Sequence, residues 1–206
     1  MNKNLEINGK TQLVCLLGSP VSHSISPAMH NEAFRLLSLN YAYLAFDVDE
    51  EHFERAVDGL ITLNAAGWNC TMPLKRLMYE RADKLSDAAL LSGAVNTIVN
   101  RDGVLWGDNT DGYGFMQSMA DAGFQAQGTH ITLLGSGGAA AAILAQAALD
   151  GARSIDVFAR SASASTRLIG EEIGRIHGTC ACRLSLYDLA DTVQLKKSLA
   201  ESQALI

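Results

Sequence analysis

The stretch HITLLGSGGAAAAILAQAALDG, residues 130–151, joins a short apolar run to a long alanine-rich segment through a cluster of glycines. The apolar run has the length of a buried strand, and the alanine-rich segment has the length and composition of a helix. Between them lies the pattern Gly135-x-Gly137-x-x-Ala140. A glycine loop that follows a strand and opens a helix is typical of a dinucleotide-binding βα unit, with a plain glycine-rich turn as the alternative.

The small residues of this loop each have a physical role in such a unit. Gly135 permits the tight turn, Gly137 lets the backbone approach a pyrophosphate, and Ala140 allows the helix to pack closely on the strand. The N-terminus of the helix then faces the phosphates. The pattern predicts cofactor contacts from Gly135, Ser136, Gly137, Gly138 and Ala139.

The end of the next predicted strand, VFARS, bears on the choice of coenzyme. NAD sites usually place an acidic residue there, about 20 residues after the loop, to bind the ribose 2′-hydroxyl. This chain has Arg160 instead, and Asp156 lies too early in the strand for that role. Because a cation suits a 2′-phosphate, the sequence favours NADP, with NAD as an alternative and Ser161 as a further contact.

Strand and helix patterns alternate along the whole chain, which predicts parallel sheets covered by helices. The strand-like runs are 12–18, 41–48, 65–72, 154–160, 180–186 and 204–206, and the helical patterns are 26–39, 50–63, 111–122, 165–178 and 189–202, with another from about Leu74. A hairpin turns at Asp102–Gly103. We expect two α/β domains, 1–112 and 113–206, the second a Rossmann-like doubly wound parallel sheet that is incomplete because its last strand ends the chain.

Composition excludes several classes of partner. The 206 residues are 48% hydrophobic and 18% charged, which is typical of a globular chain. The net charge is −6 and no run of lysine or arginine occurs, so neither nucleic acid nor an anionic membrane is expected as a partner. The polar N-terminus has no apolar signal core, and we expect a cytoplasmic protein.

The four cysteines are too few for a secreted disulfide framework in a chain of this length. Cys180 and Cys182 form a C-x-C pair, but no second ligand pair accompanies it. On an alternating strand both would face one side. No metal site is therefore expected.

The N-terminal half contains a set of polar residues that suits a small anionic ligand. Ser24 and Ser26 lie two apart just before a helix, where two hydroxyls can hold a carboxylate; the alternative is that Ser26 only caps the helix. His23 and His30 are expected to be structural. Further candidates are Asn69, Thr71, Lys75, Asn96 and Asp111.

Lys75 and Asp111 each have a simple structural interpretation when taken alone. Lys75 can be a solvated lysine, although a cation at a helix start opposes the helix dipole. Asp111 can be an N-cap or a first-turn acid. Only the complete set of residues favours a functional role for both.

Five blocks of sequence closely resemble the shikimate dehydrogenases, including the quinate/shikimate dehydrogenases. They occur in the family's order and spacing, from about residue 12 to the end of the chain: GSPVSHSISPAMHN, NCTMPLK, GAVNTIV, GDNTDGYGF and LLGSGGAA. The resemblance implies a shikimate-binding catalytic domain over 1–112, an NADP-binding Rossmann domain over 113–206, and an active-site cleft between them.

The resemblance also implies a reaction, the reversible NADPH-dependent reduction of 3-dehydroshikimate to shikimate in the pathway to chorismate and aromatic amino acids. It implies that Ser24 and Ser26 bind the substrate carboxylate, and that Thr71, Asn96 and Asp111 bind the ring hydroxyls. Lys75 and Asp111 correspond to the catalytic pair. A cation beside the ketone oxygen stabilises the negative charge that develops there and can supply the proton.

Two departures from the family pattern lead to further expectations. Ala159-Arg160-Ser161 stands where the family usually has Asn-Arg-Thr, which keeps the arginine but puts the coenzyme preference in question. The family's C-terminal segment, which carries a glutamine that contacts substrate, has no counterpart after Ile206. We therefore expect a fragment of low stability and weak or absent activity. Quinate as substrate, a non-catalytic remnant that only binds ligand, and a monomeric or homodimeric state are left open.

Overall fold

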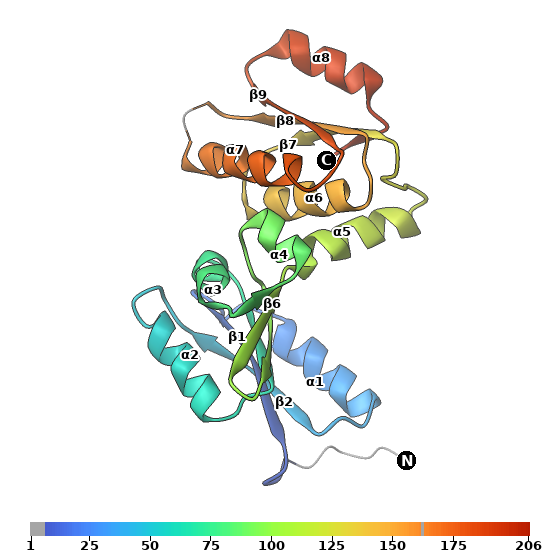
Figure 1. The fold of residues 1–206 in the computed structure, drawn as a ribbon. Coiled ribbons are helices and arrows are strands. Elements are labelled where there is room, and N and C mark those ends of the chain that lie inside the picture. Colours follow the sequence, from blue (N-terminus) through green and yellow to red (C-terminus); the bar gives the residue numbers. More distant parts are fainter. Residues whose placement is uncertain (1–6, 162) are drawn as a thin grey trace. The chain divides into compact units, whose positions relative to one another are not determined.

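In the computed structural model, which describes residues 7–161 and 163–206, the chain divides into two units. The first unit runs to Ser86 and resumes over Ala94–Asp108, and the second comprises Asp87–Gly93 and Asn109–Ile206 (Figure 1). Residues 87–93 thus fold with the second unit although the first unit flanks them in the sequence.

The first unit is a six-stranded mixed sheet with helices on both faces. Its elements are β1 (Gln12–Gly18), α1 (Ser26–Leu36), β2 (Tyr41–Asp47), α2 (Phe53–Thr62), β3 (Gly67–Cys70), α3 (Lys75–Arg81), β4 (Lys84–Leu85), β5 (Thr97–Arg101) and β6 (Val104–Asp108). The strand order is β2-β1-β3-β5-β6-β4. β1 pairs in parallel with β2 and β3, whereas β5 is antiparallel to both β3 and β6.

The centre of this sheet is a point where the chain reverses its direction of winding. From β1 it crosses to β2 on one side, and from β2 it returns past β1 to β3 on the other side. Because such crossovers are right-handed, α1 and α2 lie on opposite faces of the sheet (Figure 1). The loops that leave the carboxyl ends of β1 and β3 therefore diverge, which is where open α/β sheets bind ligands.

The second unit is a four-stranded sheet in which all strands are parallel. Its elements are α4 (Asp87–Ser92), α5 (Thr110–Asp121), β7 (His130–Leu134), α6 (Gly138–Leu149), β8 (Ser154–Ala159), α7 (Ala164–His177), β9 (Arg183–Asp188), α8 (Thr192–Glu201) and β10 (Ala204–Leu205). The order β10-β7-β8-β9 is that of the doubly wound dinucleotide-binding fold, with the reversal between β7 and β10.

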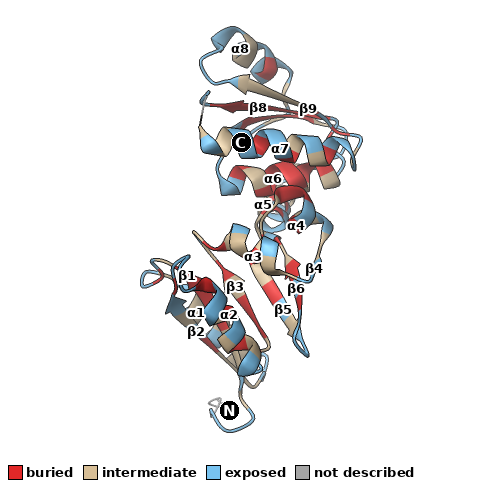
Figure 2. Cartoon of the chain, turned by 60° about the vertical axis from the view of Figure 1, so that its left-hand side comes forward, coloured by how far each residue is buried: buried red, intermediate tan, exposed pale blue. Residues whose placement is uncertain are grey.

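The core of the second unit forms around α6 and β8. Every residue of β8 is buried, and seven of the twelve residues of α6 are buried, which gives the red band in Figure 2. A helix that is apolar on nearly all sides needs neighbours on all sides. Here α4, α5 and α7 all contact α6.

The α/β class and the doubly wound sheet are confirmed, and two local expectations need correction. Ser26 is not the N-cap of α1: Ile25 is, and the Ser24 hydroxyl accepts a hydrogen bond from the Ser26 N–H. Cys180 and Cys182 precede β9 instead of lying within a strand. The short elements α4 and β4 were not expected. No helix among the described residues is long and apolar enough to cross a bilayer.

Close packing of α5 on α6 leads to a stability prediction for Gly112. A Cβ atom at buried Gly112 would overlap the carbonyl oxygen of Ala142 in α6. Gly112→Ala is therefore expected to lower the free energy of unfolding by about 1–3 kcal/mol, measured by denaturant titration.

Gly114→Ala is the matched control, because a Cβ at Gly114 meets open space on the same helix. Its stability should be unchanged or raised, since alanine is the better helix former. Equal effects of the two substitutions would contradict this packing.

Burial of Glu172 leads to a prediction about pH. Its side chain is 1% exposed, Oε1 has no hydrogen-bond partner among the described residues, and burial raises its pKa from 4.5 to about 9. The folded chain thus holds a proton that the unfolded chain loses above pH 4.5, so stability should fall as pH rises from 4.5 toward 9. Glu172→Gln should flatten that fall in Tm between about pH 5 and 8.

The exposed neighbour Glu171 supplies the control for this prediction. Glu171→Gln should keep the pH dependence of the unaltered chain. Parallel Tm curves for Glu172→Gln and the unaltered chain would show that Glu172 titrates normally.

Candidate active site

A cavity of about 500 Å³ lies in the first unit at the carboxyl ends of β1 and β3. It is lined by the loop that follows β1 and by the residues that follow β3. Among its lining residues are Ser24, Ser26 and Thr71, three of the residues predicted to bind substrate, and His23. The divergence of the two loops leaves the space between them.

Backbone hydrogen bonds fix the walls of this cavity. The Thr71 N–H donates to the Leu17 carbonyl at 2.9 Å, and the Ser19 N–H donates to the Met72 carbonyl at 3.1 Å, so each loop is tied to the other strand. A Cβ atom at Gly18 would overlap the methyl group of Thr71. Glycine at this position therefore lets the Thr71 side chain lie against the end of β1.

Lys75 and Asn96 are joined to each other through the backbone. Lys75 is the first residue of α3, and its carbonyl accepts a 2.9 Å hydrogen bond from the N–H of Val95. The next residue, Asn96, is buried; its N–H donates to the Asp108 carbonyl, and its carbonyl accepts from Cys70. The start of α3 and the Asn96 loop are thus held side by side in one unit.

A partly buried polar network next to these residues was not predicted from the sequence. The Tyr43 hydroxyl donates to Asn69 Oδ1 at 2.8 Å, and Asn69 Nδ2 donates to Thr97 Oγ1 at 3.1 Å. Thr97 Oγ1 in turn donates to Asn96 Oδ1 at 2.9 Å. The period of β2 indicates that Tyr43 shares a face with Tyr41. It carries no information on which polar side chain Tyr43 meets across the sheet.

Asp111 lies in the second unit, in the first turn of α5. The N-cap of that helix is the buried Asn109, whose Oδ1 accepts a 3.1 Å hydrogen bond from the Asp111 N–H. Asn109 Nδ2 donates to Ser92 Oγ at 3.0 Å, which ties α4 to the start of α5. Of the two structural interpretations, Asp111 is the first-turn acid, and Asn109 is the cap that sequence reasoning missed.

The glycine loop has the geometry expected of a phosphate cradle. Gly135 has φ +123°, a conformation that side chains rarely adopt, so the turn needs glycine. The N-cap of α6 is Gly137, with no side-chain cap, and Cβ atoms at Gly137 and Gly138 would meet open space. An open helix N-terminus with no side chain over it fits a pyrophosphate.

Arg160 and Ser161 follow the end of β8, and both are exposed. The Ser161 hydroxyl donates to the Asp188 carboxylate at the end of β9, and this bond lowers the Asp188 pKa. Ser136 Oγ lies 2.9 Å from Ser165 Oγ, so the glycine loop also contacts the start of α7. These residues provide one cation and several hydroxyls next to the cradle.

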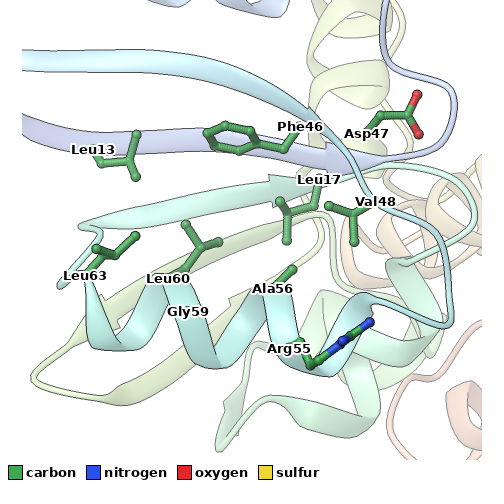
Figure 3. Close-up of a pocket in the computed structure, with 10 residues that line it drawn as sticks. All are labelled: Leu13, Leu17, Phe46, Asp47, Val48, Arg55, Ala56, Gly59, Leu60 and Leu63. Atoms are coloured by element: carbon green, nitrogen blue, oxygen red, sulfur yellow. The ribbon is translucent and has the colours of Figure 1, made fainter.

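A second cavity of about 400 Å³ lies in the first unit between α2 and the strands β1 and β2 (Figure 3). Its walls are mostly aliphatic, with Asp47 and Arg55 toward one end. None of the predicted site residues lines it. We assign it no role in catalysis.

Comparison with known proteins identifies the family. A shikimate dehydrogenase (NADP(+)) of Listeria monocytogenes is 45% identical over 196 residues, which are 95% of this chain and 67% of that protein. The chain belongs to the shikimate dehydrogenase family. A family model described as the shikimate dehydrogenase substrate binding domain matches residues 16–98.

Solved structures of family members have the same fold. The crystal structure of a shikimate 5-dehydrogenase from L. monocytogenes in complex with shikimate and NAD matches with a TM-score of 0.92 and 44% identity, covering 97% of this chain and 68% of that one. A shikimate dehydrogenase in complex with NADP⁺ matches with a TM-score of 0.77 and 36% identity over 88% of this chain and 63% of that one. The family resemblance seen in the five sequence blocks is thereby confirmed.

Proposed function

We propose that this chain catalyses the reversible reduction of 3-dehydroshikimate to shikimate with NADPH, in the pathway to chorismate and the aromatic amino acids. As a family member it is an oxidoreductase acting on a CH–OH group, with NADP as coenzyme. The observation that carries the proposal is the cavity of Ser24, Ser26 and Thr71 at the switch point of the sheet in the first unit, which also contains Lys75 and Asn96.

The first unit binds the substrate. Ser24 and Ser26 lie at the start of α1 on one wall of the cavity, where hydroxyl donors and the helix N-terminus favour a carboxylate. Thr71 on the opposite wall and Asn96 next to the start of α3 bind ring hydroxyls. The spacing of the two walls then orients the ring between carboxylate and hydroxyl ligands.

Lys75 and Asp111 form the catalytic pair for proton transfer to the carbonyl oxygen. When the carbonyl carbon accepts hydride, the C=O π pair moves to oxygen, and the Lys75 ammonium donates a proton to that oxygen. In the oxidation of shikimate the Lys75 amine takes the hydroxyl proton back. Asp111, which belongs to the second unit, is the second member of the proposed catalytic pair and a ligand of the reacting hydroxyl.

The second unit binds the coenzyme, which supplies the hydride when bound. The N–H groups of Ser136, Gly137, Gly138 and Ala139 at the start of α6 hold the pyrophosphate. Arg160, assisted by Ser161, neutralises the 2′-phosphate that distinguishes NADP from NAD. The Ser161 hydroxyl already donates a hydrogen bond to the Asp188 carboxylate. Arg160 therefore provides most of the attraction for the 2′-phosphate.

We further propose a cytosolic enzyme, active as a monomer or homodimer, whose partners are its small-molecule ligands alone. All four cysteines lie in the described residues as free thiols, which suits a reducing compartment. The net charge of −6 opposes binding to nucleic acid or to an anionic membrane.

The role of Lys75 is tested by shikimate-dependent reduction of NADP⁺, followed by nicotinamide absorbance. Lys75→Ala should lower kcat by about 10²–10⁴-fold, because the proton donor and the cation beside the oxygen are lost together. The Tm should change little, since Lys75 is only half-buried, in the first turn of a short helix.

Arg76→Ala is the matched control on the same helix, because Arg76 is exposed and pairs only weakly with Glu80. Its kcat should equal that of the unaltered chain. A Lys75→Ala variant with near-normal kcat would refute the assignment of Lys75. If the unaltered chain reduced no NADP⁺ in the presence of shikimate, that result would count against the reaction itself.

A further inference from the structure

The Tyr43 hydroxyl, which also hydrogen-bonds with the Ser26 side chain, donates into a directed chain of hydrogen bonds that ends on a predicted substrate ligand, Asn96. It donates to Asn69 Oδ1 at 2.8 Å, and Asn69 Nδ2 donates to Thr97 Oγ1 at 3.1 Å. Thr97 Oγ1 then donates to Asn96 Oδ1 at 2.9 Å. All four residues lie in the first unit: Tyr43 on β2, Asn69 on β3, Thr97 at the start of β5 and Asn96 just before it.

The direction of this chain fixes the orientation of two amide groups. Asn69 receives a proton on Oδ1, so its Nδ2 must face Thr97 and the Asn96 carbonyl, to which it also donates at 3.2 Å. Thr97 accepts from Asn69 and has its single proton left for Asn96 Oδ1. Asn96 therefore turns its oxygen toward Thr97 and its NH₂ group to the other side, as a donor.

The ring of Tyr43 is held in place without the help of its hydroxyl. Asn31 Oδ1 accepts from the Tyr43 N–H and Asn31 Nδ2 donates to the Tyr43 carbonyl, both at 2.8 Å. The ring stacks on His30 with 4.4 Å between centroids. Because the ring is 1% exposed, burial raises the Tyr43 pKa to about 12, and the phenol stays a proton donor at all working pH values.

We propose that Tyr43 is a positioning residue for the substrate: through Asn69 and Thr97 it sets the Asn96 amide as a donor to a ring hydroxyl oxygen. The inference rests on the proposed function, because it takes Asn96 as a ligand. A chain of polarised hydrogen bonds strengthens each of its members, so the loss of the first weakens the last.

Tyr43→Phe tests this inference because it keeps the ring, the stacking and the backbone contacts and removes the hydroxyl, with its hydrogen bonds to Asn69 and to the Ser26 side chain. Because Ser26 is also a proposed ligand, the Thr97→Val variant described next, which leaves the contact of Tyr43 with Ser26 in place, separates the path through Asn96 from an effect through Ser26. With Asn69 Oδ1 left unpaired and the chain broken, KM for shikimate should rise about tenfold or more. Since Asn96 binds ground state and transition state alike, kcat should stay within about threefold. Tyr41→Phe, the same change two residues earlier on β2, is the control and should alter neither constant.

Thr97→Val breaks the same chain one step later and completes a double-mutant cycle. Each single substitution should raise KM. The KM of the double variant should be close to that of the single variant with the higher KM, because both substitutions interrupt the same path to Asn96. If Tyr43→Phe does not fold, as judged by its Tm, Thr97→Val alone tests the same change in KM with unchanged kcat.

Three results would overturn the inference. They are a KM of Tyr43→Phe within about twofold of that of the unaltered chain, a kcat that falls by the same factor as kcat/KM, and additive effects of Tyr43→Phe and Thr97→Val in the cycle. Failure of the unaltered chain to bind shikimate in a calorimetric titration would instead contradict the proposed function, and the role of Tyr43 with it. Normal binding by the unaltered chain and by Tyr43→Phe would leave the proposed function intact and remove the positioning role.

Discussion

Each proposed ligand site of this chain lies at a reversal of winding direction between parallel strands of a sheet. In the first unit the reversal falls between β1 and β3, and in the second between β7 and β10. At such a point the loops that follow two neighbouring strands of the sheet turn away from each other. A gap is left between these loops at the edge of the sheet. The first gap is the cavity of Ser24 and Thr71, and the second lies over the glycine loop.

The residues around the two gaps differ in the way that the two proposed ligands require. A pyrophosphate is held best by backbone N–H groups, so the second unit needs an open helix N-terminus and small residues. A ring with several hydroxyls needs side-chain donors and acceptors of defined orientation, so the first unit has a hydrogen-bonded layer of Tyr43, Asn69 and Thr97 behind its ligands. Pairing of its polar atoms offsets the cost of removing them partly from water and also makes the layer rigid.

The sequence predicts local chemistry well and contacts across strands poorly. The glycine loop and the helix that it opens follow from residue types alone, because glycine freedom and helix dipoles act within a few residues. The pairing of Tyr43 with Asn69 depends on the register of β2, β1 and β3, which no single strand encodes. Ser24 and Ser26 were predicted correctly at the start of α1, but the predicted N-cap was wrong. The N-cap is Ile25, one residue before Ser26, and the Ser24 hydroxyl accepts the N–H of Ser26.

The division of ligands between the two units is tested most directly by NMR titration of the isotope-labelled chain. Shikimate alone should shift the backbone amides of residues 19–26, 69–75 and 96, and NADP⁺ alone should shift those of residues 135–140 and 160–166. Shikimate shifts centred on the glycine loop, or NADP⁺ shifts centred on the loops after β1 and β3, would contradict the assignment of one ligand to each reversal.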